Sequence, residues 1–152
     1  MSVPLLEAIA DAIYEEEGNK PGQRANRNRN PGNLRPFSTD QDRDSGGYRI
    51  FPSFVDGYTA LLHDIAVKIL GMGKSGLSLD STLVQFFQVY APAADQNFPL
   101  RYARNVAGYL ARVYLIVGLT ENNTFRELYA FAKQEVPSGV EPNRDPAAIH
   151  EP

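Results

Sequence analysis

The first third of the chain places a short amphipathic helix directly before a long polar segment. Pro4 is suited to the first turn of a helix, and Gly18 supplies a stop signal. The apolar residues between them recur at helical spacing and are Leu5, Leu6, Ile9 and Ile13. From residue 19 to residue 52 the chain is rich in Gly, Pro and Asn. This order predicts a helical lobe joined to a small lobe of loops, with the end of the first helix facing the loops.

The rest of the chain reads as mainly helical. Tyr48, Ile50 and Phe51 are the best strand residues of a small hairpin. Further helices are predicted by apolar spacing and by capping residues, over Ser53–Leu70, Leu79–Tyr90, Pro99–Val117 and Thr124–Val136. We therefore predict a mainly α (α+β) fold in one domain over residues 1–136. Residues 137–152 carry several prolines and no apolar periodicity, so we expect a flexible C-terminal tail.

Composition excludes several classes of protein. The 152 residues are 43% hydrophobic and 22% charged, which is typical of a globular domain. Cysteine is absent, and the two histidines stand alone, so we expect no metal and no cofactor. No apolar run approaches the roughly 20 residues of a membrane helix, and the acidic N-terminal segment does not resemble a secretory signal.

A basic segment follows the first helix. Between Gly18 and Thr39 there is no acidic residue, and the cations are Lys20, Arg24, Arg27, Arg29 and Arg35. These charges could form a solvated loop or a patch for an anionic polymer. Nucleic acid is not the expected polymer, because the net charge is −3 and no nucleic-acid motif is present.

Three consecutive glutamates, Glu15, Glu16 and Glu17, end the first helix. Negative charge is unfavourable at the C-terminal end of a helix dipole, which suggests a role other than helix stability. At 100° per residue, Glu16 lies about 35° and Glu17 about 65° from the centre of the apolar stripe. Glu17 should therefore be partly buried, and burial raises a carboxyl pKa as a general acid requires. Helix geometry alone leaves Glu16 as a rival.

Several motifs together resemble one family. They are Glu17–Gly18, the Arg-Asn-x-Asn-Pro-Gly-Asn loop of Arg27–Asn33, Gly47–Ser53, Asp56–Leu61, and Tyr90–Pro92 with Asp95, Asn97 and Tyr102. This pattern resembles the phage-associated lysozyme-like muralytic domains, which are related in fold to lytic transglycosylases and are sometimes labelled virion structural proteins. The resemblance covers roughly Leu5–Val117. It implies a lysozyme-like fold with a small β-hairpin lobe and a helical lobe.

The resemblance also implies a site. In such domains the glutamate before the glycine is the catalytic acid, which selects Glu17. Arg29 departs from the loop pattern, which often has asparagine at that position. The expected partner is a peptidoglycan strand, bound by a monomer that neither inserts into membranes nor binds nucleic acid. Residues expected to bind the glycan are Asn28, Asn30, Asn33, Tyr48, Phe51, Ser53, Tyr90, Asn97 and Tyr102.

The implied reaction is cleavage of the β-1,4 bond between N-acetylmuramic acid and N-acetylglucosamine. A hydrolase of this kind needs a second carboxylate to activate water. Asn26 stands where phage lysozymes usually have that aspartate, and the nearest acids after it are Asp40, Asp42 and Asp44. A lytic transglycosylase needs only one glutamate, and the sequence favours that route.

An alternative of a different class is a non-catalytic, glycan-binding component of a virion or secretion device. In either case we expect synthesis in the cytoplasm without a signal peptide. Lysis, a virion or a secretion machine would then bring the protein to the cell wall or periplasm.

Overall fold

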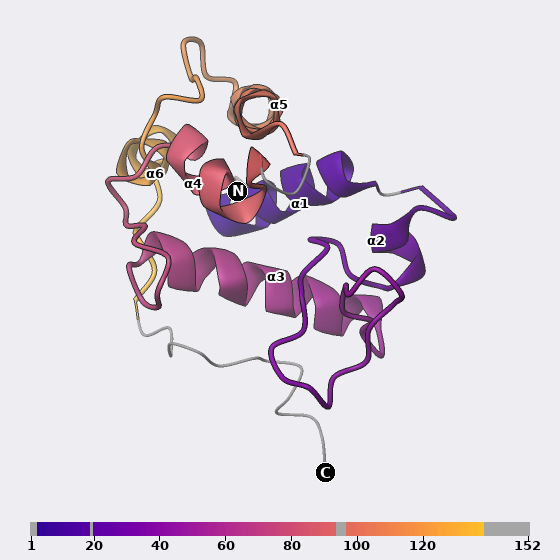
Figure 1. Ribbon diagram of the computed structural model, residues 1–152. Helices are drawn as coiled ribbons and strands as arrows, with labels where there is room; N and C mark the ends of the chain where they lie inside the picture. The colour runs from indigo at the N-terminus through magenta and orange to yellow at the C-terminus, as the bar shows by residue number, and fades with distance from the viewer. Residues whose placement is uncertain (1–2, 19, 94–96, 139–152) are drawn as a thin grey trace.

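The computed structural model describes residues 3–18, 20–93 and 97–138, and this part of the chain is mainly helical. Figure 1 shows α1 between α3 and α5, with α4 and α6 together at one end and the loops around α2 at the other. The helices are α1 (Leu5–Glu17), α2 (Arg24–Arg27), α3 (Phe54–Ile69), α4 (Leu83–Tyr90), α5 (Pro99–Tyr114) and α6 (Phe125–Ala132). Most of the expected tail, residues 139–152, lies outside the described residues.

One hydrophobic core joins the helices. The predicted stripe of α1 faces this core, where Ile9 and Ile13 have no exposed surface. The other elements contribute large apolar side chains that are equally buried, among them Leu61, Ile65, Phe86, Phe87, Val106, Leu110 and Phe125. Because α1 packs against both α3 and α5, its C-terminal end is held where α3, α5 and the loop lobe meet.

The helix ends follow local capping chemistry. Gly18 ends α1 with a φ of 104°, and its N–H donates to the carbonyl of Tyr14. Ser53 accepts from the N–H of Asp56 at the start of α3, as its sequence pattern predicts. The helix α4 begins at Leu83, later than the predicted Leu79, because Thr82 and Gln85 form the capping box there.

Two later helices end earlier than predicted. After α5, Leu115 adopts left-handed φ and ψ angles of 54° and 46°. After α6, Lys133 does the same, with 55° and 45°. The predicted extensions to Val117 and Val136 are therefore wrong, since a left-handed residue breaks the helical hydrogen-bond pattern.

The predicted hairpin is reduced to a tight turn with one antiparallel bridge, between Arg43 and Arg49. Two hydrogen bonds flank this bridge, from the N–H of Ile50 to the carbonyl of Asp42 and from the N–H of Asp44 to the carbonyl of Tyr48. The N–H groups of Arg49 and Phe51 donate outside the turn, to the carbonyls of Leu34 and Asn28. These residues thus tie the loop lobe together without forming strands, and we call residues 42–50 the hairpin turn.

Candidate functional site

Glu17 lies at the end of α1 with both carboxylate oxygens held. Asn33, from the loop that follows α2, donates its amide N–H to Oε2 at 2.8 Å. Tyr102, from α5, donates its hydroxyl to Oε1 at 2.8 Å. The two donors come from opposite lobes of the molecule, so the carboxyl group is oriented by the packing of α1, α5 and the loop together.

The pKa of Glu17 is raised above its ordinary value. Burial is the largest cause, and the negative charge of Glu16 adds to it. The hydrogen bonds from Asn33 and Tyr102 and the positive charge of Arg24 act in the opposite direction. The net result is a carboxyl that keeps its proton to a higher pH than an exposed glutamate does. It can still ionise, because the hydrogen bonds from Asn33 and Tyr102 stabilise the negative charge.

The neighbouring glutamates are placed differently. Glu15 and Glu16 are exposed, and Glu16 accepts a hydrogen bond from the amide of Asn105 at 3.2 Å. Neither is among the residues that line the cleft beside Glu17. The ambiguity between Glu16 and Glu17 left by helix geometry is therefore resolved in favour of Glu17 as the cleft residue.

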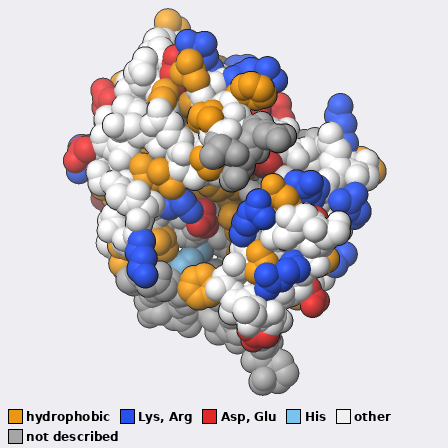
Figure 2. Space-filling model, viewed as in Figure 1, with side chains coloured by type: hydrophobic (Ala, Val, Ile, Leu, Met, Phe, Trp, Pro, Cys, Tyr) orange, Lys and Arg blue, Asp and Glu red, His pale blue; other side chains and the backbone are white. Residues whose placement is uncertain are grey.

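The cleft has a volume of about 400 Å³ and lies between the helices and the loop lobe. Figure 2 looks into it and shows a hollow with acidic atoms in its depth and Lys and Arg side chains along its sides. One face of α3 forms one wall with Ala60, His63, Asp64, Val67 and Lys68. The opposite wall comes from the loop lobe, with Gly32, Asn33, Leu34, Arg35, Phe37, Tyr48 and Arg49, and the end of α4 adds Val89, Tyr90 and Ala91.

The loop that carries Asn33 is fixed from both sides. Tyr90 donates its hydroxyl to the carbonyl of Gly32, and a side chain on Gly32 would meet that hydroxyl. Asn30 has no exposed surface, and its amide N–H groups donate to the carbonyls of Leu34 and Arg49 at 2.9 and 2.8 Å. Its Oδ1 accepts from the N–H of Leu34 at 2.9 Å. This support holds Asn33 against Glu17.

Four of the residues predicted to bind glycan line the cleft, and they are Asn33, Tyr48, Tyr90 and Asn97. A fifth, Tyr102, is buried and contacts Glu17 directly, which makes it a residue that orients the carboxyl group. The structure thus brings these residues together around Glu17. Their contacts with a glycan stay a prediction.

The other four have structural positions and do not line the cleft. Phe51 and Asn30 have no exposed surface. Asn28 is buried and donates to a carboxylate oxygen of Asp44 at 2.9 Å. The hydroxyl of Ser53 is used in the cap of α3, where it also donates to the carboxylate of Asp56. Each side chain is thus used by the fold away from the lining of the cleft.

The aspartates considered as a second acid do not line the cleft. Asp40 is exposed, and a hydrogen bond with Ser38 lowers its pKa. Asp44 accepts from Asn28 and from the N–H groups of Gly46 and Tyr48, and these bonds lower its pKa as well. Asp42 offers its backbone carbonyl to Ile50. These hydrogen bonds show that Asp42 and Asp44 stabilise the hairpin turn.

Asp64 is the second carboxylate of the cleft within the described residues, and sequence reasoning missed it. It lies one turn before Lys68 on α3 and pairs with that lysine. An aspartate and a lysine at this spacing look like an ordinary surface pair of a helix. Only the packing of the loop lobe over α3 turns them into cleft residues. No group of three or more metal-binding side chains occurs in the described ranges.

Replacing Tyr102 by phenylalanine should raise the pKa of Glu17 further. The hydroxyl of Tyr102 donates to the carboxylate and so favours the ionised form of Glu17. Without this hydrogen bond, less opposes the rise in pKa that burial causes. The titration of the Glu17 carboxyl carbon, followed by NMR, should move to higher pH. Asn105→Ala is the matched control, because Asn105 donates to Glu16 instead. A midpoint that falls or stays in Tyr102→Phe would contradict this assignment.

Comparisons of the chain with models of protein families, with curated proteins and with solved structures gave no match. No helix in the described part of the chain is both long enough and apolar enough to cross a bilayer.

Proposed function

We propose that this protein cleaves the β-1,4 bond between N-acetylmuramic acid and N-acetylglucosamine in peptidoglycan, with Glu17 as the proton donor. The observation that carries the proposal is a carboxyl with a raised pKa that borders a cleft and is oriented by two hydrogen-bond donors. A general acid that works near neutral pH needs this combination of burial and orientation. The sequence resemblance to lysozyme-like muralytic domains supports the same reading. On this proposal the lobe around α2 and the hairpin turn takes the place of the β-hairpin lobe.

In the proposed reaction, Glu17 gives its proton to the glycosidic oxygen as the bond from that oxygen to the anomeric carbon breaks. The sugar that keeps the anomeric carbon acquires positive charge. Asn33 and Tyr102 then stabilise the Glu17 carboxylate by the hydrogen bonds that they already donate. The carboxylate afterwards takes a proton from the group that attacks the anomeric carbon, which restores the acid.

Two attacking groups lead to two products. In the transglycosylase route, the 6-hydroxyl of the same muramic acid residue attacks and leaves a 1,6-anhydro end. This intramolecular step is favoured by its high effective molarity. In the hydrolase route a water attacks, and Asp64 is the described cleft residue that could serve as its base. We favour the route with one glutamate, because Asp64 already forms an ion pair with Lys68.

Clearing of chloroform-treated Gram-negative cells tests the proposal. The wild-type protein should reduce the turbidity of the suspension, and Glu17→Gln at the same concentration should not. Equal clearing by both proteins would overturn Glu17 as the acid. Should the wild-type protein leave turbidity unchanged and yet sediment with purified peptidoglycan, the glycan-binding component of a virion or secretion device becomes the correct function.

A further inference from the structure

The loop-lobe wall of the cleft carries an arginine and tyrosine cluster. The guanidinium carbons of Arg24 and Arg35 lie 4.1 and 4.4 Å from the centre of the Tyr48 ring. Both Arg35 and Tyr48 line the cleft, as does Arg49. An aromatic ring beneath a guanidinium group restrains its plane, so less conformational freedom is lost when the group binds a ligand.

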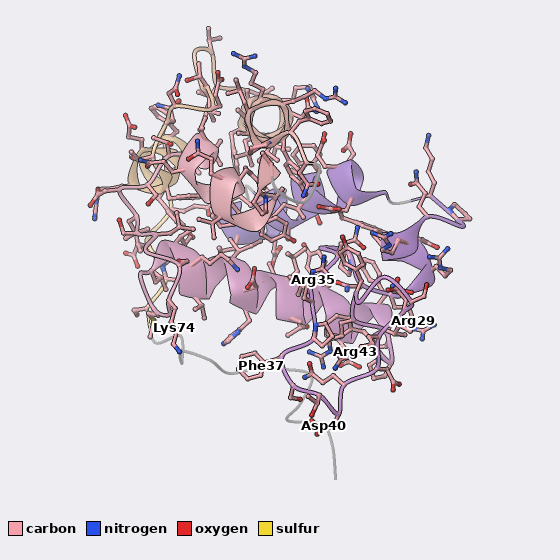
Figure 3. The ribbon with its side chains drawn as sticks, in the orientation of Figure 1. Arg29, Arg35, Phe37, Asp40, Arg43 and Lys74 are labelled. Carbon is pink, nitrogen blue, oxygen red and sulfur yellow. The ribbon has the colours of Figure 1, made fainter. Side chains whose placement is uncertain are left out.

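The arginines of this lobe differ in their position relative to the cleft. Three of them donate to backbone carbonyls of nearby loops, as Arg35 also does, with Arg27 bound to Gly22, Arg29 to Phe51, and Arg43 to Ser38. These bonds stabilise the loops. The same three residues are absent from the cleft lining. Figure 3 shows Arg29 on the outer side of the lobe and Arg35 on the side that faces the helices.

Arg35 is the exposed arginine of the cleft wall. Its Nη1 donates one hydrogen bond to the carbonyl of Gly46 at 3.3 Å, and no ion pair joins it to an acid in the described ranges. By contrast, Arg24 lies 3.7 Å from a carboxylate oxygen of Asp44. A guanidinium group has five N–H donors in a planar fork that fits a carboxylate. Most of the donors of Arg35 are therefore open for a ligand.

The charge balance of the cleft also favours an anion. Lys68 and Asp64 neutralise each other in their ion pair. When Glu17 carries its proton, as the proposed acid must before reaction, the exposed Arg35 keeps its positive charge in the lining with no ion pair to an acid among the described residues. A neutral glycan gains nothing from this charge, whereas a glycan with carboxylate substituents does.

We propose that Arg35, supported by Tyr48, is a specificity residue that binds a carboxylate carried by the glycan strand. The inference rests on the proposed function and names the substrate class as an acid-substituted glycan. Peptidoglycan offers two sources of this carboxylate. One is the stem peptide with its free carboxyl groups, and the other is the lactyl group of a muramic acid residue from which the peptide has been removed.

Binding measured without turnover tests this assignment. In the Glu17→Gln background, calorimetry would compare three ligands: a disaccharide-peptide oligomer from peptidoglycan, the same glycan after amidase removal of the peptides, and chitotetraose, which has no carboxylate. Arg35→Gln should lower the affinity for the recognised acidic ligand by about tenfold. The affinity for chitotetraose should change by no more than about twofold. The preference for that ligand should also fall as salt is raised.

Arg27→Gln is the matched control, because it removes the same charge from an exposed residue outside the cleft and should change none of the affinities. Loss on the peptide-bearing ligand alone assigns the stem peptide, and loss on the denuded strand alone assigns the lactyl carboxylate. Loss on both acidic ligands assigns a site that accepts either carboxylate. Equal effects of Arg35→Gln on chitotetraose and the acidic ligands, or no effect on any, would overturn the carboxylate site and leave the glycan cleft intact. Failure of all three ligands to bind would overturn the proposed function with it.

Discussion

Replacing Glu17 by glutamine should lower the rate of wall lysis by about a thousandfold or more. The substitution keeps the shape of the side chain and removes the proton that the leaving oxygen must receive. General acid catalysis contributes a factor of about 10²–10⁴ to the rate of such reactions. Glutamine also cannot act as the carboxylate that afterwards takes a proton from the attacking group. Glu16→Gln is the matched control and should keep full activity, because Glu16 is exposed and lies outside the cleft lining. An active Glu17→Gln beside an inactive Glu16→Gln would contradict the account.

The same variant should be more stable than the wild type at neutral pH. The folded state raises the pKa of Glu17 above its ordinary 4.5, so it binds the proton more tightly than the unfolded chain does. Wild-type stability contributed by this group is thus complete below pH 4.5 and is lost as pH rises through the folded pKa. Glutamine has no such loss. Denaturation curves of the two proteins should converge in acid and separate at neutral pH, and a less stable Glu17→Gln at neutral pH would contradict the burial argument.

Gly57→Ala should destabilise the fold by about 2 kcal/mol or more, although alanine is the better helix former. Gly57 lies inside α3, and a Cβ there would come within 2.0 Å of the backbone carbonyl oxygen of Arg29. A backbone atom cannot turn aside as a flexible side chain can, so the loop that leads to Asn33 must move. We expect a lower denaturation midpoint together with a loss of lysis, because Asn33 would no longer meet Glu17 in its present position.

Gly108→Ala provides the matched control within another helix. Gly108 lies in α5, and a Cβ there meets only the end of the Arg112 side chain, at 3.5 Å. This variant should be more stable than the wild type by up to about 1 kcal/mol, since the helix gains propensity without a clash. If Gly57→Ala were stabilising like Gly108→Ala, the close packing of the loop on α3 would be wrong.

The helices could be predicted because their signals are local. The stripe of α1, the stop at Gly18 and the capping pairs at Ser53 and Thr124 all act within a few residues. The hairpin could not be predicted correctly. Tyr48, Ile50 and Phe51 have the side chains of a strand, whereas the backbone N–H groups of Arg49 and Phe51 donate to Leu34 and Asn28, outside the turn. The short helix α2 was also missed, because its four residues lie in a segment dominated by loop signals.

The site was predictable to the same extent. Glu17 follows from the helix stripe and the Glu-Gly motif, both read from neighbouring residues. The role of Asn30 is different from the predicted one, because an asparagine suited to glycan contacts is equally suited to satisfying buried backbone groups. Asp64 and Arg35 gain their places only when the loop lobe packs over α3. Such long-range contacts cannot be predicted from the spacing of residues in the sequence, since they depend on which faces of distant elements meet.

Mass spectrometry of digested peptidoglycan tests the central claim most directly. Purified wall material would be incubated with the wild-type protein and with Glu17→Gln, and the soluble fragments compared. The account predicts muropeptides with 1,6-anhydro ends from the wild type, lighter than hydrolysis products by the mass of one water, and none from the variant. Reducing ends that accept borohydride would instead show a hydrolase and make Asp64→Asn the next variant to test. Intact glycan strands after incubation with the wild-type protein would contradict glycosidic cleavage itself.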